Sequence, residues 1–281
     1  MQPIVAVIAP GMMGSGVGGR LAQNGIEVRT ALGGRSEASV GRAGAAGMVG
    51  VSDAQIAASD FILSIVPPGE ALGLAERLAP ALRVAANQPI YVDCNAVNPA
   101  TVLRIARTIE ETGATFVDGG IIGGPPTPGS KGTKLYVSGP AAARVAALAA
   151  YGLEERVPPG PIGAASAMKM SYAGITKGFT ALGAAMMLAA ARAGTTEALR
   201  AELSTSQPAL HGWLTRQMPR MYSKAYRWVA EMEEISGFVG DAPAAAQFFQ
   251  AAARLYERIA ADYDAKRAEC AALDAFCEPK P

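Results

Sequence analysis

The sequence predicts an α/β protein in which an N-terminal, doubly wound parallel sheet precedes an all-α domain. Two observations predict the sheet: short apolar runs alternate with alanine-rich helical stretches over residues 1–160, and the first apolar run ends at a glycine-rich turn. A third observation predicts the helical domain, since no convincing strand follows Ile162. We therefore expect two domains, residues 1–160 and residues 161–281, that meet in the Pro- and Gly-rich segment 156–165.

Seven strands are expected in the first domain. Each is a short run of apolar and β-branched residues, and the fourth, DFILSIV, is apolar nearly throughout, as a strand buried on both faces should be. The expected strands are residues 4–8, 27–32, 47–51, 60–66, 89–95, 114–119 and 134–139. The expected helices between them include residues 69–86, 98–113 and 140–151.

The second domain has the pattern of helices separated by glycine and proline. The expected helices are residues 164–193, 196–205, 208–219, 222–236 and 242–274. The longest uncharged apolar run, residues 178–191, has 14 residues, fewer than the roughly 20 that span a membrane. We therefore expect a soluble protein, and a cytoplasmic one because no basic segment of the signal-peptide kind precedes the first strand.

The composition excludes several classes of function. Lys and Arg number 25 against 24 Asp and Glu, so no basic face for nucleic acid is expected. The chain has one histidine and three cysteines, and Cys94, Cys270 and Cys277 lack the spacing of metal ligands. We expect no metal site, and a reducing compartment fits an odd number of cysteines.

Residues 4–19, IVAVIAPGMMGSGVGG, contain two overlapping glycine motifs. A dinucleotide-binding fingerprint of the Rossmann type begins where a buried strand ends, and its last glycine opens a helix. The complete G-x-G-x-x-G begins at Gly14, six residues after Ile8, and leaves too short a helix before Gly25. The incomplete motif begins at Ala9, directly after the strand, and leaves room for a helix from about residue 12 to residue 24.

We therefore expect the incomplete motif to bind the cofactor. In this register Gly11 allows close approach of the pyrophosphate, and Gly14 lets the helix pack on the strand. Ala9 replaces the glycine of the tight turn, which is acceptable if its φ stays negative. Met12 and Met13 open the helix and are expected beside the cofactor. A glycine-rich turn without a ligand is the alternative.

The end of the second strand predicts which dinucleotide is bound. NAD-binding chains usually place an acidic residue there for the ribose hydroxyls, but this chain continues with Gly34, Arg35 and Ser36. A guanidinium can bind a 2′-phosphate through two N–H groups, so we expect NADP(H) rather than NAD(H). The alternative is a solvated loop arginine. Val66 and Pro67, which follow the fourth strand, and Asn95, at the end of the fifth, are expected to complete the cofactor site.

Lys169 is the candidate catalytic residue. It is a lone charge in the apolar helical segment AASAMKMSYAG, and burial that lowers a lysine pKa makes it a general acid and base. The alternative is a lysine whose ammonium reaches water from a core helix. Asn95 and Tyr172 are candidates to polarise the substrate, as is Ser171. Lys177 either anchors an acidic substrate group or pairs with a carboxylate; both remain open.

Four segments resemble the β-hydroxyacid dehydrogenase and 6-phosphogluconate dehydrogenase superfamily, in particular 6-phosphogluconate-dehydrogenase-like proteins with a distinctive α-helical C-terminal domain. The segments are APGMMG, VDCNAVNP (92–99), FVDGGIIGGPPTPGSKGTKLYVSG (116–139) and GAASAMKMSYAGITKG (163–178). The resemblance implies hydride transfer with a nicotinamide cofactor, a catalytic lysine at Lys169 and a substrate in the cleft between the two domains. It also implies a homodimer in which one subunit's C-terminal domain helps close the partner's site, where Trp228 could select substrate. Packing in the core is the alternative for Trp228.

Three departures from the family pattern concern the substrate. Ile122, Gly123 and Gly124 stand where the family has Ser-Gly-Gly, whose serine holds a carboxylate. Ala173 replaces an asparagine, and Asn95 replaces a serine. The leading hypothesis is therefore an NADP-dependent oxidoreductase acting on a small hydroxy or carbonyl compound. The alternatives are an imine reductase-like enzyme that reduces C=N bonds and a non-catalytic NADP-binding sensor or scaffold.

Overall fold

A computed structural model describes residues 2–130 and 132–278 and divides the chain into two compact units, Met1–Met170 and Ser171–Pro281. The division falls inside helix α7 (Ala164–Arg192) and not at the expected boundary between residues 160 and 161. The reason is that the first turns of α7 pack against the sheet: a Cβ placed on Gly120 would lie 3.2 Å from Lys169 Cβ.

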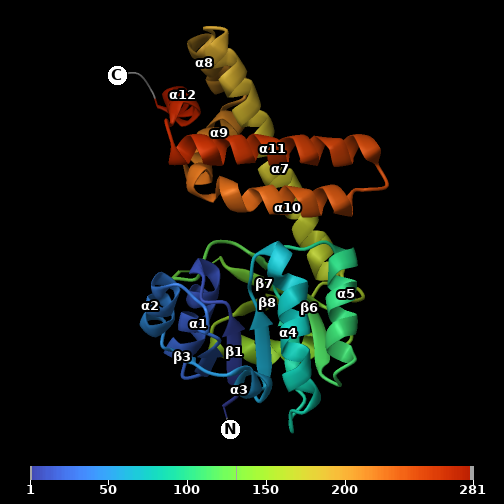
Figure 1. Cartoon of the computed structure of the whole chain (residues 1–281). Helices are drawn as coiled ribbons and strands as arrows, with labels where there is room; N and C mark the ends of the chain where they lie inside the picture. Colours follow the sequence, from blue (N-terminus) through green and yellow to red (C-terminus); the bar gives the residue numbers. More distant parts are fainter. Residues whose placement is uncertain (1, 131, 279–281) are drawn as a thin grey trace. The chain divides into compact units, whose positions relative to one another are not determined.

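The first unit contains one eight-stranded sheet in the order β3-β2-β1-β4-β5-β6-β7-β8 (Figure 1). The strands are β1 (Ile4–Ile8), β2 (Glu27–Thr30), β3 (Met48–Gly50), β4 (Phe61–Ser64), β5 (Ile90–Asp93), β6 (Thr115–Ile122), β7 (Lys134–Ser138) and β8 (Glu154–Arg156). The strand order reverses between β1 and β4, and these two strands are parallel. This is the order of a doubly wound nucleotide-binding fold, so the predicted fold class is confirmed.

Two features of the sheet differ from the prediction. β7 pairs with β6 in the antiparallel sense, because the connection 123–133 contains no helix and is too short for the crossover that a parallel pair requires. β8 is an additional strand, parallel to β7 at the edge of the sheet. Its sequence, EER, is charged and largely exposed, so it lacks the apolar pattern of the other strands.

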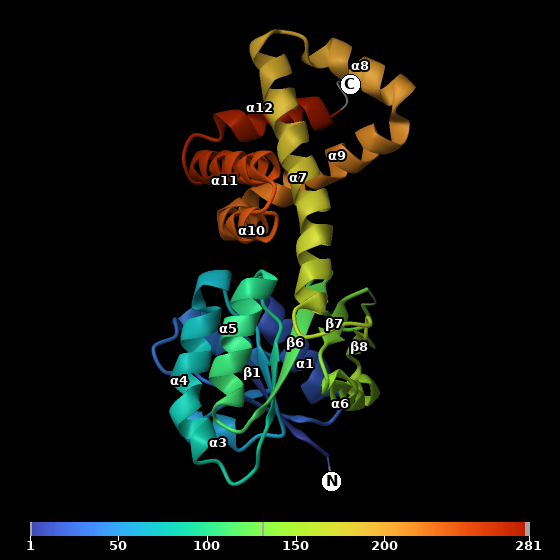
Figure 2. The ribbon, with the colours of Figure 1, turned by 90° about the vertical axis from the view of Figure 1, so that its right-hand side faces the viewer.

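Helices cover both faces of this sheet, with α4 and α5 on one face and α1 and α6 on the other (Figure 2). The helical elements are α1 (Met12–Gln23), α2 (Glu37–Ala45), α3 (Asp53–Ala57), η1 (Pro68–Glu70), α4 (Ala71–Arg83), α5 (Pro99–Glu110), α6 (Ala142–Val145) and η2 (Ala146–Tyr151). Two apolar cores result: Leu78 and Ile105 pack on one face of the sheet, and Val17 and Leu21 pack on the other.

The second unit is helical throughout its described residues. After α7 it contains α8 (Thr196–Ser206), α9 (Pro208–Met221), η3 (Tyr222–Lys224), α10 (Ala225–Phe238), α11 (Pro243–Asp264) and α12 (Ala268–Cys277). Helices α10 and α11 lie side by side (Figure 1). The single helix expected at residues 242–274 is wrong, because the chain turns between α11 and α12, where Arg267 has φ 54°.

Helix α7 is long and apolar enough to cross a membrane by length and composition, but half of its most apolar window is buried within the structure, as in a core helix. Along the remaining surface of α7, five large apolar side chains are between 44% and 73% exposed. These residues, which we call the α7 stripe, are Tyr172, Ile175, Phe179, Leu182 and Met186. Their spacing of three and four residues places them on one side of the helix.

Candidate functional site

The glycine loop after β1 adopts the geometry of the incomplete motif. Helix α1 begins at Met12 with Gly11 as its N-cap, and no side chain caps its first turn. A Cβ on Gly14 would lie 1.9 Å from the carbonyl oxygen of Ala9, so the helix packs directly on the end of β1. A Cβ on Gly11 would meet no atom within 4 Å. The space beside Gly11 is therefore open, and the uncapped amides at the start of α1 suit the diphosphate of a dinucleotide.

The other residues of the loop also fit this register. Ala9 does not have a positive φ, and its N–H donates to the carbonyl of Ile65 at 3.0 Å. Met12 is exposed at the start of α1, whereas Met13 packs against the apolar core beneath the helix. Because this position does not need a positive φ, alanine can replace the first glycine of the motif.

The loop between β2 and α2 contains the three residues expected at the ribose. Gly34 has φ 71°, and a Cβ there would meet no atom within 4 Å. Ser36 is the N-cap of α2 and accepts a hydrogen bond from the N–H of Ser39. The Arg35 side chain makes no hydrogen bond or ion pair with residues 2–130 or 132–278, so its guanidinium is available to a ligand.

A second arginine, which the sequence analysis missed, connects this loop to the glycine loop. Arg42 Nε donates to the carbonyl of Pro10 at 3.1 Å, and Arg42 Nη2 donates to Ser39 Oγ at 2.7 Å. The only signal for it in the sequence is its place on the helix that follows β2. Its contacts bring the two predicted cofactor-binding segments together.

Asn95 joins the ends of β4 and β5. Its Oδ1 accepts from the N–H of Val66 at 2.7 Å, and its Nδ2 donates to Ser64 Oγ at 2.8 Å and to Asp93. Asn95 is 2% exposed and its amide is fully used by these contacts. It therefore positions the loop after β4, which continues through Pro67 into η1, and we find no free group on it to polarise a substrate.

Asp93, at the end of β5, is a buried carboxyl group that the sequence analysis did not single out. Its Oδ2 has no hydrogen-bond partner among the described residues. Burial raises the pKa of Asp93 to about 7, and the nearby carboxylate of Asp118 acts in the same direction. Hydrogen bonds from Asn95 and the positive charge of Lys169 oppose the rise in this pKa.

Asp118 of β6 holds the beginning of α7. Its Oδ1 accepts from Ser166 Oγ at 2.6 Å, and its Oδ2 accepts from Ser138 Oγ at 2.8 Å and from the N–H groups of Gly163 at 3.0 Å and Ser166 at 3.1 Å. Burial raises the pKa of Asp118, while these hydrogen bonds favour the ionised form. The sequence pattern that could have drawn attention to Asp118 is a lone acidic residue in the apolar run FVDGG. The carboxylate caps the helix that carries Lys169.

Lys169 lies at the carboxyl end of the sheet. Its aliphatic stem is against Gly120, since a Cβ on that glycine would be 3.3 Å from Lys169 Cδ. Its positive charge acts to lower the pKa of both Asp93 and Cys94. Tyr172, three residues further along α7, is half exposed and belongs to the second unit.

The expected substrate loop follows β6, which ends at Ile122. Gly123 has φ 118°, and a Cβ there would lie 2.6 Å from the carbonyl oxygen of Gly132, so only glycine fits. The carbonyl of Gly124 accepts from Thr133 Oγ1 at 2.6 Å. The loop is therefore closed on itself by backbone contacts, and Ile122 offers no hydrogen-bonding side chain to a carboxylate.

Lys177 and Trp228 form a separate cluster in the second unit. Lys177 pairs with Glu231, and the two side chains are 18% and 16% exposed. The Lys177 Nζ lies 5.1 Å from the Trp228 ring centroid, and the hydroxyl of Tyr256 donates to the Lys177 carbonyl at 2.5 Å. Burial lowers the pKa of Lys177 although Glu231 opposes this. Of the two alternatives for Lys177, the structure shows the pairing with a carboxylate.

Comparison with protein families gives two matches. Residues 4–150 match the NAD binding domain of 6-phosphogluconate dehydrogenase, and residues 190–259 match a domain of unknown function (DUF1932). Among curated proteins, an uncharacterized 28.5 kDa protein in the 7S RNA 5′ region of Methanothermus fervidus is 31% identical over 159 residues. That match covers 56% of this chain and 59% of the relative, so this chain spans less than two thirds of the relative's length.

Solved structures show the same fold over nearly the whole chain. A conserved protein of unknown function, described as structurally similar to 3-hydroxyacid dehydrogenases, is 30% identical with a TM-score of 0.66, covering 90% of this chain and 98% of its own. A 3-hydroxyisobutyrate dehydrogenase from Mycobacterium tuberculosis is 19% identical with a TM-score of 0.69, covering 98% and 99%. An imine reductase from Myxococcus stipitatus, in complex with NADP+, is 18% identical with a TM-score of 0.60, covering 98% and 100%.

Proposed function

The chain belongs to the family of the NAD binding domain of 6-phosphogluconate dehydrogenase, and we propose that it is an NADP-dependent oxidoreductase with Lys169 as general acid and base. The substrate is a small hydroxy or carbonyl compound. The observation that carries the proposal is the place of Lys169, whose aliphatic stem lies against Gly120 of β6. The carboxyl edge of a doubly wound sheet is where such folds bind their ligands.

The chemistry divides between the cofactor and the chain. A bound nicotinamide supplies or accepts the hydride. Lys169 Nζ gives a proton to the substrate oxygen when a carbonyl is reduced, and takes it back when an alcohol is oxidised. Asp118 holds the start of α7 through three hydrogen bonds, from Ser166 Oγ and from the N–H groups of Gly163 and Ser166, which fixes the lysine in position. The uncapped amides at the start of α1 fit the cofactor's diphosphate.

Replacing Lys169 tests the mechanism. We expect Lys169→Ala to lower kcat at least about 100-fold, the usual contribution of a general acid, while the Kd for NADPH stays unchanged. The assay follows NADPH consumption with a panel of small aldehydes, ketones and cyclic imines. Lys266→Ala, at an exposed position, is the matched control. A fully active Lys169→Ala variant would show that the proton comes from another group.

The preference for NADP(H) follows from Arg35. Its guanidinium has no partner in the described part of the chain, and the loop before α2 contains no acidic side chain to bind ribose hydroxyls. Arg35→Ala should weaken NADPH binding about tenfold or more and change NADH binding less than about twofold, since one charge-assisted contact contributes roughly 1.5–3 kcal/mol. Nicotinamide fluorescence titrations measure both, with the exposed Arg104→Ala as control. Equal losses for the two cofactors would refute the assignment.

Reduction of C=N bonds is a second candidate reaction. The observation that favours it is Ile122, an apolar residue at the end of β6 where a carboxylate-binding group is absent. Cyclic imines that are reduced faster than hydroxy acids are oxidised would support this candidate. A protein that binds NADPH and consumes it with no compound of either class would instead be a sensor or scaffold.

We also propose that the chain is a cytoplasmic homodimer that pairs through its C-terminal helices. The α7 stripe is the supporting observation, because a row of five exposed apolar side chains is costly in water. Light scattering after size exclusion should give twice the chain mass of 28.8 kDa. Phe179→Glu, in the middle of the stripe, should yield the monomer, and a wild-type monomer at micromolar concentration would contradict the proposal.

A further inference from the structure

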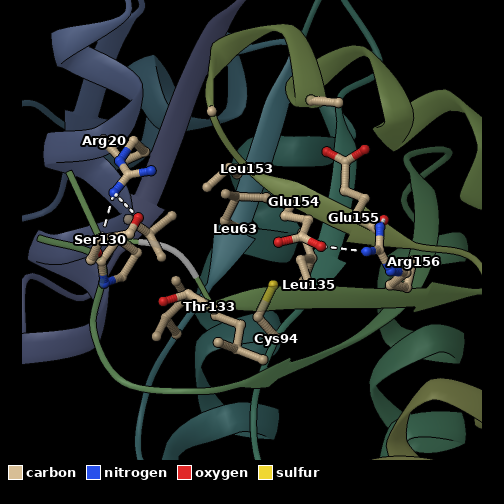
Figure 3. A pocket seen from close by; sticks show the side chains of 17 residues that line it. Arg20, Leu63, Cys94, Ser130, Thr133, Leu135, Leu153, Glu154, Glu155 and Arg156 are labelled. Atoms are coloured by element: carbon tan, nitrogen blue, oxygen red, sulfur yellow. Dashed lines mark hydrogen bonds and ion pairs between the residues drawn. The ribbon is translucent and has the colours of Figure 1, made fainter. Parts of the chain in front are cut away.

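A cavity of about 450 Å³ lies within the first unit, bordered by α1, the connection 123–133 and the edge strand β8 (Figure 3). None of the residues expected to bind cofactor or substrate lines it. The volume is in the range of pockets that hold small organic ligands, roughly 300–1,000 Å³. The cavity is large enough to bind a small molecule; it adjoins the expected substrate loop, and Cys94, which follows β5, lines it.

The walls of the cavity are mainly apolar, with side chains from α1, the sheet and η2. The apolar lining residues are Val17, Leu63, Ile65, Ile121, Leu135 and Leu153. Several of these belong to the apolar core on the α1 face of the sheet. The cavity is thus suited to the apolar body of a ligand.

Most polar groups in the lining already have partners within the chain. Arg20 Nη2 donates to the carbonyl of Thr127 at 2.8 Å and to the carbonyl of Ser130 at 3.1 Å, which ties α1 to the connection above the cavity (Figure 3). Arg156 pairs with Glu154 on the same strand. The guanidinium groups of these two arginines therefore already make contacts that stabilise the cavity wall.

Unlike these arginines, Glu155 has a side-chain oxygen without a hydrogen-bond partner among the described residues. It stands opposite Leu135 in the parallel pairing of β7 and β8, so its side chain is on the same face of the sheet as that cavity-lining leucine. Its Oε1 is buried and has no hydrogen-bond partner among residues 2–130 and 132–278. Burial raises the pKa of Glu155 to about 7, and no cation among residues 2–130 and 132–278 acts to lower it. Within the described residues Oε1 therefore lacks a donor, and a donor group on a bound ligand would stabilise the carboxylate.

We propose that this cavity binds a small organic amine, with the protonated amine on the Glu155 carboxylate and the apolar body against the leucines of the wall. A neutral apolar molecule would leave the buried carboxylate unpaired, and an anion would be repelled by it. An ammonium group supplies the charge-assisted hydrogen bond that Oε1 lacks. The proposal does not depend on the oxidoreductase function, since the two sites share no assigned residue.

The test compares three probes of the same size on the full chain: benzylamine, benzyl alcohol and benzoate. Binding is measured by calorimetric titration at pH 8, and the variants of Glu154 and Glu155 decide whether the probe occupies this cavity. We expect benzylamine to bind at least about tenfold more tightly than benzyl alcohol, and benzoate more weakly than either. Equal affinities, tighter binding of benzoate, or no binding of benzylamine at millimolar concentration would overturn the proposal.

Two variants and a change of pH locate the amine. Glu155→Gln should reduce benzylamine affinity to that of benzyl alcohol, whereas Glu154→Gln, which removes a largely exposed carboxylate already paired with Arg156, should leave it unchanged. Lowering the pH from 8 to 5.5 should weaken benzylamine binding about tenfold or more as Glu155 takes up a proton. Glu155→Gln should melt no lower than the wild type at pH 8. A folded Glu155→Gln variant with unchanged benzylamine affinity would refute the assignment.

Discussion

Gly14 is the position where one methyl group should test the glycine loop most directly. A Cβ added there would lie 1.9 Å from the carbonyl oxygen of Ala9 and 3.0 Å from its carbonyl carbon. Contacts of a real Cβ essentially never fall under 3.0 Å, so α1 must move by 1.1 Å (3.0 − 1.9) relative to the end of β1. Both neighbouring atoms belong to the backbone and cannot rotate away. We expect Gly14→Ala to lower the free energy of unfolding by about 1–3 kcal/mol.

Gly11→Ala is the matched control, three residues earlier in the same loop. Its Cβ would meet no atom of the chain within 4 Å, and the φ of −69° at this N-cap is allowed for alanine. Its stability should therefore change by less than about 1 kcal/mol. The methyl group would, however, occupy the space where the diphosphate must approach the backbone, so the affinity for NADPH should fall about tenfold or more.

The assay pairs thermal unfolding without cofactor with fluorescence titration of NADPH. In a chain of this size 1 kcal/mol shifts Tm by roughly 2–4 °C, so Gly14→Ala should melt several degrees lower while Gly11→Ala melts with the wild type. A Gly14→Ala variant of wild-type Tm would show that α1 does not pack this closely on β1. Wild-type NADPH affinity in Gly11→Ala would show that the loop is not the diphosphate site.

Two further predictions concern buried charges. The pKa of Asp93 is about 7 in the folded chain, against an ordinary value of 3.8. Between these two values the folded state binds more protons than the unfolded state, so the stability of the wild type falls as pH rises from about 4 to 7. Between pH 5 and pH 8, the free energy of unfolding of Asp93→Asn should rise by about 2 kcal/mol relative to that of the wild type, as measured by urea unfolding. If this difference does not change with pH, burial is not the cause of the raised pKa of Asp93. Lys177→Met leaves the carboxylate of Glu231 unpaired and should cost about 2–3 kcal/mol at pH 7, while the double variant with Glu231→Leu should recover most of it. A double variant no more stable than Lys177→Met would show that the ion pair is not the source of the loss.

The strands of the sheet could be predicted because most of them are marked by a pattern within a few neighbouring residues. Most of the first seven strands are marked by short apolar runs, although β2 (EVRT) is mainly polar. The register of the glycine motif follows from the end of β1, which can be placed from the sequence without knowing the fold. Residues 154–156 could not be predicted as a strand, since a charged edge strand forms through its neighbour β7 and not through its own apolar pattern. The turn at Arg267 was missed because neither glycine nor proline marks it.

Some residues of the candidate site could likewise be predicted from a local pattern, and others could not. Lys169 stands out as a lone charge in an apolar helix, and Arg35 stands out because the expected acid is missing. Asp118 and Ser166 are 48 positions apart, so their hydrogen bond appears only once β6 and α7 are packed together. Long-range pairs of this kind decide which polar residues are structural and which remain available, and the sequence alone does not identify them.

The contact between Arg42 and the carbonyl of Pro10 also bears on attempts to convert the enzyme from one nicotinamide cofactor to the other. Cofactor conversion is commonly pursued by rewriting the residues after β2 as a block. Replacing a block that includes Arg42 would also release the neighbouring glycine loop. The resulting loss of activity would then be misread as failed selectivity. A library that varies residues 34–36 and retains Arg42 separates the two effects, because only the chemistry at the ribose then changes.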